Sequence, residues 1–219
     1  MIKNERFYFD KDLLSKSNKH DYILGIDEVG WGCIAGELVL GGALIHKSFF
    51  DLIESNDFVE LIKDSKKVSD KKRIILLENL KDQSLIKTTV GVASVDFINS
   101  VPNLAEAYTL CIDQILNSFK TELNSSLILI DGNRDPKTKL IKNFNLIIKG
   151  DDKSLTIGIA SNVAKQHRDD LMVQHSLKYP HYNFENNVGY GTEVHCKALK
   201  TFGLTQIHRK KACQSILNK

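Results

Sequence analysis

The stretch Tyr22-Ile-Leu-Gly-Ile-Asp-Glu-Val-Gly-Trp-Gly32 decides how this chain folds. Its apolar beginning predicts a buried strand, and this strand ends in two adjacent acids followed by a glycine pair. Carboxylates gathered at the end of a buried strand repel one another and lose hydration. They therefore persist mainly where a divalent cation or bound protons offset that cost. Asp27 and Glu28 are the first candidate functional residues.

The same pattern occurs twice more along the chain. Asp131 follows Leu-Ile-Leu-Ile, and Asp151 follows Leu-Ile-Ile-Lys-Gly. Asp and Gly are also ordinary turn residues, so any one of the three places has a simpler explanation. Three coincidences favour acids that meet at one edge of a sheet, where hard oxygen ligands suit Mg²⁺ or Mn²⁺. The predicted catalytic and metal-binding residues are Asp27, Glu28, Asp131 and Asp151.

Length and composition set limits on the rest of the protein. The 219 residues are enough for one well-filled core with a modest C-terminal extension. The sequence contains neither an apolar stretch long enough to span a membrane nor a signal peptide, which predicts a cytoplasmic protein. The four cysteines are far apart, so they predict neither a zinc site nor a disulfide framework.

Hydrophobic periodicity and turn residues predict a mixture of strands and helices. The expected elements are strands at 22–28 and 38–46 around a glycine-rich turn at 30–36, helices at 51–62 and from Ser69, a strand at 85–94, a long helix opened by Pro102, strands at 127–130 and 145–148, a helix at 154–177, a loop at 179–191 and a final helix from Thr192. This order predicts an α/β domain with a mixed sheet and a helical tail.

The formal net charge of +3 is too small to decide whether the partner is a polyanion. Basic residues do form clusters, although such runs are more often solvated helix faces. Their positions in the fold have to decide between the two interpretations. The clusters are Lys63 with Lys66 and Lys67, residues 71–73, Lys165 with His167 and Arg168, and residues 208–211.

Six segments, in the same order along the chain, together resemble ribonuclease HII, the type 2 ribonuclease H family that cleaves the RNA strand of RNA/DNA hybrids. They cover the chain from about residue 22 to about residue 211. The segments are Gly25-Ile-Asp-Glu-Val-Gly-Trp-Gly32, Asp64-Ser-Lys-Lys67, Asp131-Gly-Asn133, Lys149-Gly-Asp151, Ala164-Lys-Gln-His-Arg-Asp169, and Gly189-Tyr-Gly-Thr192 with His195.

The resemblance implies a ribonuclease H-like fold, with a mixed five-stranded sheet flanked by helices and a C-terminal helical extension. It implies a catalytic domain at 1–178, with residues 179–219 packed on it. The four acids are then ligands of two Mg²⁺ or Mn²⁺ ions, and cleavage leaves 5′-phosphate and 3′-hydroxyl ends. Two ions about 4 Å apart can activate water and neutralise charge at both reacting oxygens. The expected partners are RNA/DNA hybrids and ribonucleotide-containing duplex DNA, with no membrane, and we expect a monomer.

The resemblance also implies a set of substrate contacts. Tyr190 resembles the tyrosine that stacks on the deoxyribose beside the ribonucleotide, while Asp152 has no assigned role. His195, one helical turn after Thr192, is expected to brace the Tyr190 loop, and His208-Arg209 to belong to the stabilising tail. The implied substrate-binding residues are Gly30, Trp31, Gly32, Lys66, Asn133, Lys165, Arg168 and Tyr190.

The chain departs from the family at the glycine turn. Relatives have Gly-Arg-Gly at positions 30 to 32, whereas this chain has Gly-Trp-Gly. Backbone recognition of 2′-hydroxyls is retained if the glycines keep their conformation, but the phosphate contact of that arginine is lost. Trp31 either stacks on a base or sugar or packs against neighbouring loops. We therefore predict activity on hybrids ahead of incision at a single embedded ribonucleotide.

Two other functions fit parts of the sequence. Gly30-x-Gly32-x-x-Ala35 matches a loose dinucleotide-binding pattern, but residues 37–45 predict a strand where that fold needs a helix. A hybrid-binding protein that has lost catalysis is the second alternative. The four intact acids argue against it, because a protein without catalysis has no need to keep clustered charge.

Overall fold

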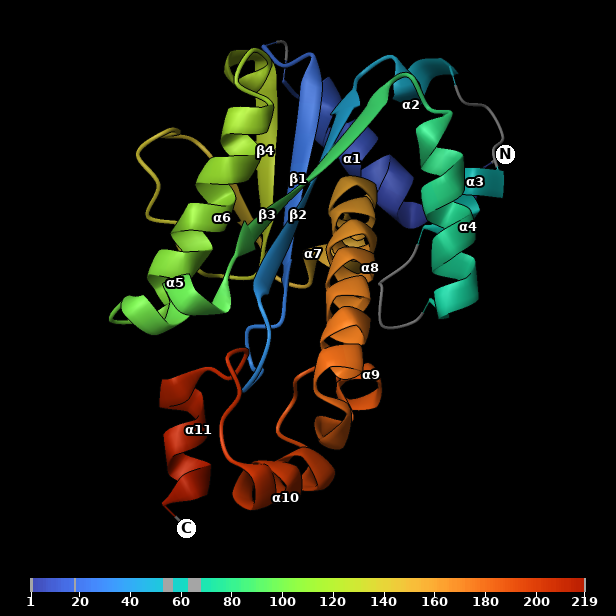
Figure 1. The fold of residues 1–219 in the computed structure, drawn as a ribbon. Coiled ribbons are helices and arrows are strands. Elements are labelled where there is room, and N and C mark those ends of the chain that lie inside the picture. Colours follow the sequence, from blue (N-terminus) through green and yellow to red (C-terminus); the bar gives the residue numbers. More distant parts are fainter. Residues whose placement is uncertain (1, 18, 53–56, 63–67, 219) are drawn as a thin grey trace.

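A five-stranded mixed sheet forms the centre of the fold (Figure 1). The computed structural model describes residues 2–17, 19–52, 57–62 and 68–218. The strand order is β3-β2-β1-β4-β5; β1 is antiparallel to β2 and parallel to β4, β2 is antiparallel to β3, and β4 is parallel to β5. This confirms the predicted fold class. The strands are β1 (Tyr22–Val29), β2 (Leu38–His46), β3 (Ile86–Ala93), β4 (Ser126–Asp131) and β5 (Asn145–Ile147).

Helices cover both faces of this sheet (Figure 1). Polar residues cap several of them: the side chains of Ser94, Asn103, Ser154 and Thr192 each accept a hydrogen bond from a first-turn amide. The helices are α1 (Glu5–Ser15), α2 (Phe49–Leu52), α3 (Asp57–Leu61), α4 (Asp70–Lys81), α5 (Val95–Ser100), α6 (Leu104–Ser118), the 3₁₀ helix η2 (Leu123–Ser125), α7 (Gly150–Lys153), α8 (Leu155–Lys178), the 3₁₀ helix η3 (Pro180–Tyr182), α9 (Phe184–Asn187), α10 (Glu193–Phe202) and α11 (Lys210–Leu217).

Successive residues of β1 point to opposite faces of the sheet and so belong to two separate cores. Ile23 belongs to the core beneath α1, α4 and α8, whereas Leu24 and Ile26 belong to the core beneath α6. On the first face, α8 lies very close to β2. A Cβ atom on Gly41 would stand 2.0 Å from the carbonyl oxygen of Ala160, so only glycine permits this contact.

Most predicted elements are present, but several boundaries were wrong. The helix expected to open at Pro102 begins at Leu104, because Asn103 provides the cap. The single final helix is two helices, α10 and α11, since the chain leaves α10 through Gly203 at a φ of +79°. The helix predicted at 51–62 corresponds to α2 and α3, and residues 53–56 lie outside the described residues. The predicted loop at 179–191 contains the short helices η3 and α9, and α1, α5, α7 and η2 were not predicted either.

The four cysteines are free thiols, as expected. Within the described ranges, none of the helices combines the length and apolarity that crossing a membrane requires.

Helix α1 braces the beginning of α8 through a buried acid. Asp10 is fully buried, and its Oδ2 accepts hydrogen bonds from the Thr156 amide at 2.8 Å and the Thr156 hydroxyl at 2.6 Å. Burial nevertheless raises the pKa of Asp10 to about 6, and the Thr156 hydrogen bonds offset this only in part.

The raised pKa of Asp10 predicts a pH-dependent stability. An acid whose pKa is higher in the folded state stabilises that state at low pH, and this contribution is lost as the pH rises towards the folded pKa. From about pH 4 to about pH 6, the free energy of unfolding should therefore fall more steeply in wild type than in Asp10→Asn, by up to about 1.4 kcal/mol per pH unit. Urea unfolding at a series of pH values measures this. Asp12→Asn, on the exposed side of α1, is the control; equal slopes for wild type and Asp10→Asn would contradict the prediction.

Candidate active site

The ends of two neighbouring parallel strands bring the first acids together (Figure 1). Ile26 of β1 is in register with Ile130 of β4, so Asp27 and Asp131 follow at the same level. The two-residue period directs both towards the α8 side, the face to which Leu129 contributes. Asp151 arrives from the short helix α7, just after β5.

All four predicted acids line one cavity of about 390 Å³. The remaining lining residues include several of the predicted substrate contacts and one that was not predicted, Ser161 of α8. The cavity is lined by Asp27, Glu28, Val29, Gly30, Trp31, Gly32, Asp131, Asp151, Ser161, Lys165, Arg168 and Tyr190.

Asp27 is buried and crowded by the neighbouring acids. Its exposed fraction is 8%, and its Oδ1 accepts a hydrogen bond from the Glu28 amide at 2.8 Å. Burial, followed by the negative charge of Asp131, raises its pKa well above the ordinary value; Glu28 and Asp151 add to the rise, while a hydrogen bond from Ser161 opposes it. The site therefore concentrates negative charge where little water can solvate it.

Backbone and arginine contacts fix the position of Asp151. The amide of Gly150 donates to Asp131 Oδ1 at 2.5 Å, which ties the start of α7 to the end of β4. Arg6 Nε donates to the carbonyl oxygen of Asp151 at 2.9 Å, and its Nη2 lies 3.0 Å from Asp152 Oδ1. Asp152 thus pairs with α1, and it is not among the residues that line the cavity.

The donor chemistry of the cavity fits a divalent cation. Its acids offer hard oxygen ligands, and a cation would relieve the repulsion that raises the pKa of Asp27. Among the described residues, no group of three or more His, Cys, Asp and Glu side chains is already assembled as a metal cage. The fit therefore rests on charge and ligand type.

The glycine turn beside the acids is held by two buried arginines. Arg209 donates to the carbonyl oxygens of Gly30 at 2.6 Å, Gly36 at 2.8 Å and Glu37 at 2.8 Å. Arg168 donates to the carbonyls of Ala35 at 3.1 Å, Glu37 at 3.1 Å and Val188 at 2.6 Å. These contacts join the turn to the α9–α10 loop and to the segment preceding α11.

Gly30 is required by this arrangement. Its φ is +91°, a conformation that favours glycine, and a Cβ atom there would stand 2.3 Å from Arg168 Nε. Any side chain at position 30 would therefore collide with the arginine that supports the turn.

The predicted substrate contacts fall into three groups. Gly30, Trp31, Gly32, Lys165 and Tyr190 line the cavity, with Tyr190 45% exposed. Asn133 is exposed but is not among the lining residues, and Lys66 lies outside the described residues.

Arg168 lines the cavity but is fully buried, with its guanidinium hydrogen-bonded to backbone carbonyls. In the structure it supports the glycine turn, a role that the predicted substrate contact did not include. Lys165 is half-buried and forms an ion pair with Asp169 one helical turn along α8.

Two buried histidines brace the Tyr190 loop. The Thr205 amide donates to His208 Nδ1 at 2.9 Å, so the proton of His208 is on Nε2, which lies 3.1 Å from His195 Nε2. His195 Nδ1 then donates to the Tyr190 carbonyl at 2.8 Å. Burial lowers the pKa of His195. Burial and the neighbouring His195 together lower the pKa of His208 to about 4. Both shifts favour the neutral imidazoles that this chain of hydrogen bonds requires. The predicted brace is present.

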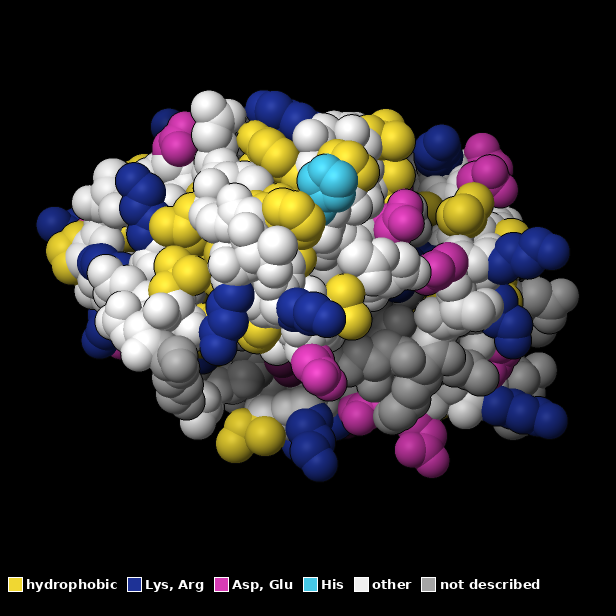
Figure 2. All heavy atoms as spheres, turned by 60° about the horizontal axis from the view of Figure 1, so that its bottom comes forward, with side chains coloured by type: hydrophobic (Ala, Val, Ile, Leu, Met, Phe, Trp, Pro, Cys, Tyr) yellow, Lys and Arg dark blue, Asp and Glu magenta, His cyan; other side chains and the backbone are white. Residues whose placement is uncertain are grey.

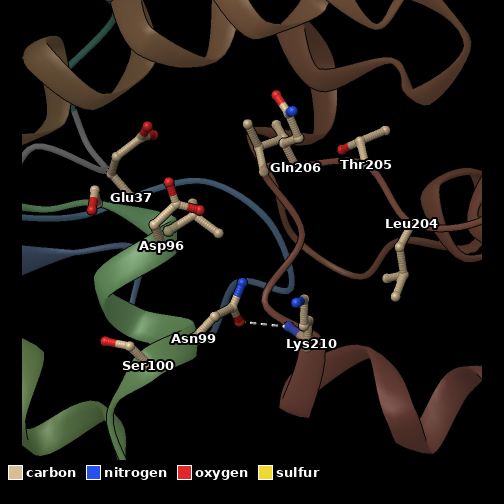
Figure 3. Close-up of a pocket in the computed structure, with 11 residues that line it drawn as sticks. Glu37, Asp96, Asn99, Ser100, Leu204, Thr205, Gln206 and Lys210 are labelled. Carbon is tan, nitrogen blue, oxygen red and sulfur yellow. Dashed lines mark hydrogen bonds between the residues drawn. The ribbon is translucent and has the colours of Figure 1, made fainter.

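A larger cavity, of about 800 Å³, lies between α5 and the segment that leads into α11 (Figure 3). Asn99 Oδ1 accepts a hydrogen bond from the Lys210 amide at 2.8 Å on its wall. None of the four clustered acids lines it. The larger cavity is therefore not the candidate active site, which we define by the clustered acids rather than by volume.

Basic side chains are spread over the face that carries the C-terminal helices. In Figure 2 the Lys and Arg side chains stand apart from one another, with acidic and apolar side chains between them. Of the cluster at 208–211, His208 and Arg209 are buried, whereas Lys210 and Lys211 are exposed.

Comparison with known proteins shows the family and the fold. The model of the family described as Ribonuclease HII matches residues 24–215. The chain belongs to the ribonuclease HII family. It is 37% identical to "Ribonuclease HII" of Clostridium perfringens (strain SM101 / Type A), over 99% of this chain and 74% of the relative. Membership makes it an endonucleolytic ribonuclease.

Two solved structures share the fold. The ribonuclease H2 from Pyrococcus horikoshii OT3 superposes with a TM-score of 0.69 at 21% identity, covering 90% of this chain and 97% of that one. Bst-RNase HIII in complex with Mn²⁺ gives a TM-score of 0.64 at 15% identity, covering 92% of this chain and 72% of that one. The dinucleotide alternative is wrong, because the chain leaves the glycine turn into strand β2 rather than into a helix.

The charge crowding around Asp27 predicts opposite effects of one substitution on stability and metal response. Asp27→Asn removes a buried charge, so without metal its melting temperature should exceed that of wild type by a few degrees. Adding Mn²⁺ should raise the melting temperature of wild type and raise that of Asp27→Asn much less.

Thermal melts with EDTA and with Mn²⁺ measure both effects. Asp135→Asn is the control, because Asp135 is an exposed acid just beyond β4 that pairs with Lys137. Equal Mn²⁺ responses in wild type and Asp27→Asn would mean that the acids do not form the ion site.

Proposed function

We propose that this ribonuclease hydrolyses the RNA strand of RNA/DNA hybrids with two divalent ions, and leaves 5′-phosphate and 3′-hydroxyl ends. The observation that supports this most directly is the convergence of Asp27, Glu28, Asp131 and Asp151 on one cavity. Buried carboxylates without a counter-cation are costly, and the pKa of Asp27 registers that cost.

The four acids would hold Mg²⁺ or Mn²⁺; a manganese complex of the structurally similar Bst-RNase HIII supports this choice. Bound ions supply an activated water and charge neutralisation at the attacking and departing oxygens. The chain's own part is to hold the carboxylates in place. Ser161 donates to Asp27, the Gly150 amide donates to Asp131, and Arg6 holds the backbone of Asp151.

Recognition of the hybrid is assigned to the other walls of the cavity. Gly30 and Gly32 have no side chains, so backbone groups can approach a 2′-hydroxyl. Tyr190 is exposed enough to stack on a sugar, and the histidine pair fixes its carbonyl. Lys165 adds a positive charge beside the acids. We keep monomeric state, cytoplasmic location and the division after residue 178 as predictions.

The decisive experiment compares cleavage with binding. Wild type should cut the RNA strand of a labelled hybrid in Mg²⁺ or Mn²⁺, and Asp27→Asn should reduce the rate at least about a thousandfold while hybrid affinity stays within a few-fold. Asp135→Asn is the control and should cut like wild type. Tight binding by wild type without cleavage in either metal would instead support the binding-protein alternative.

The glycine turn predicts the substrate preference. Since Trp31 stands where relatives have arginine, a run of ribonucleotides should be cut faster than a single ribonucleotide in duplex DNA. Two labelled duplexes that differ only in the number of ribonucleotides test this with one enzyme preparation. Equal rates on the two substrates would contradict it.

A further inference from the structure

Arg134 lies in an aromatic corner at the edge of the acid site. It follows β4 three residues after Asp131, and its Cζ stands 3.5 Å from the centroid of the Trp31 ring. The Tyr108 ring of α6 is the second wall, 5.6 Å from the same carbon. A distance of 3.5 Å requires the guanidinium to lie against the face of the indole, as in a cation–π contact.

Packing fixes the indole that carries this guanidinium. Trp31 is half-buried and meets Tyr108 edge to face, with ring centroids 6.0 Å apart and planes at 82°. Tyr108 is buried at 2% exposure in the core beneath α6, and Trp31 packs against that core. Trp31 therefore presents a ring face in a set position rather than a mobile side chain.

The stacked guanidinium keeps its hydrogen-bonding capacity. Its Nη1 is 3.9 Å from Glu28 Oε1, too far for a hydrogen bond, and Arg134 makes no hydrogen bond to any of the residues that the structure describes. The side chain is 35% exposed. A guanidinium has five N–H donors around its edge, so stacking on its face leaves them directed away from the ring.

We propose that Arg134 binds a backbone phosphate of the nucleic acid at this site and that Trp31 positions it. This rests on the proposed function, since the phosphate belongs to the hybrid being cleaved. A planar guanidinium suits bidentate contact with phosphate oxygens, and Glu28 draws the cation towards the acids. Trp31 is then a positioning residue that acts through Arg134.

The test is hybrid binding without metal, measured by fluorescence anisotropy across a series of salt concentrations. Arg134→Gln should weaken binding about tenfold and lower the slope of log affinity against log salt by about one unit. Arg134→Lys should keep the slope but lose part of the affinity, because an ammonium group stacks less well.

Lys87→Gln is the matched control. Lys87 is an exposed cation on β3, paired in register with Leu44, towards the end of the sheet away from Asp27. This variant removes one positive charge and should leave affinity and salt slope close to wild type.

The positioning role of Trp31 has its own readout. Trp31→Leu should weaken binding in the wild-type background and have no further effect when Arg134 is already Gln. Trp31→Phe, which keeps a ring, should retain most of the affinity. The double variant Trp31→Arg with Arg134→Gln should regain the salt slope of wild type, because position 31 then carries the positive charge that position 134 has lost.

The outcomes separate the two proposals. A wild-type protein that neither binds nor cleaves hybrid contradicts the proposed function and this inference with it. If wild type does bind hybrid but Arg134→Gln behaves like Lys87→Gln, only the inference is overturned. An additive effect of Trp31→Leu and Arg134→Gln would overturn the positioning role of Trp31.

Discussion

The repulsion between Asp27 and Asp131, buried at the ends of neighbouring parallel strands, is the constraint on which the rest of the site depends. Ile26 and Ile130 are paired in register on parallel strands, so the residues that follow them, Asp27 and Asp131, lie at the same level. Because side chains alternate along a strand, both acids point to the α8 side of the sheet. A hydrophobic core on that face removes water from them. The sheet that stabilises the fold therefore also creates the charge imbalance that a cation would relieve.

The two buried arginines beside the glycine turn are not among the groups that offset this charge at Asp27. Arg168 and Arg209 instead donate hydrogen bonds to carbonyl oxygens of residues 30–37, and their positive charge is used to neutralise the negative ends of those backbone dipoles. The pKa of Arg209 falls to about 10, chiefly because of burial. Its hydrogen bonds to the carbonyl oxygens compensate for the hydration that the buried guanidinium loses. Both arginines thus shape the turn that lies beside the acids, and the positive charge needed at the acids has to come from elsewhere.

The sequence predicts the acids and most strands because their signals are local. An apolar run that ends in acid and glycine can be identified without knowing its neighbours, and parallel strands necessarily gather such ends at one edge. The direction of a charged side chain has no such signal. The resemblance placed Arg168 among the substrate contacts, and the sequence carries no sign that its guanidinium is buried and donates to backbone carbonyls of Ala35, Glu37 and Val188. Arg209 was expected to belong to the stabilising tail, and it precedes α11 there; its partners Gly30 and Gly36 were not predicted, because they lie more than 170 positions earlier in the sequence and depend on tertiary structure.

Arg134 was missed for the same reason, and strand alternation explains why Glu28, rather than Asp27, faces it. Asp27 and Glu28 are adjacent, so they point to opposite faces of β1: Asp27 towards Ser161 of α8, and Glu28 towards Tyr108 and Arg134 on the α6 side. The α8 face concentrates carboxylates, whereas the α6 face places a guanidinium on an aromatic support near Glu28. A backbone phosphate bound by Arg134, as proposed above, would thus lie on the α6 side of the acids, where the Trp31 ring supports the guanidinium.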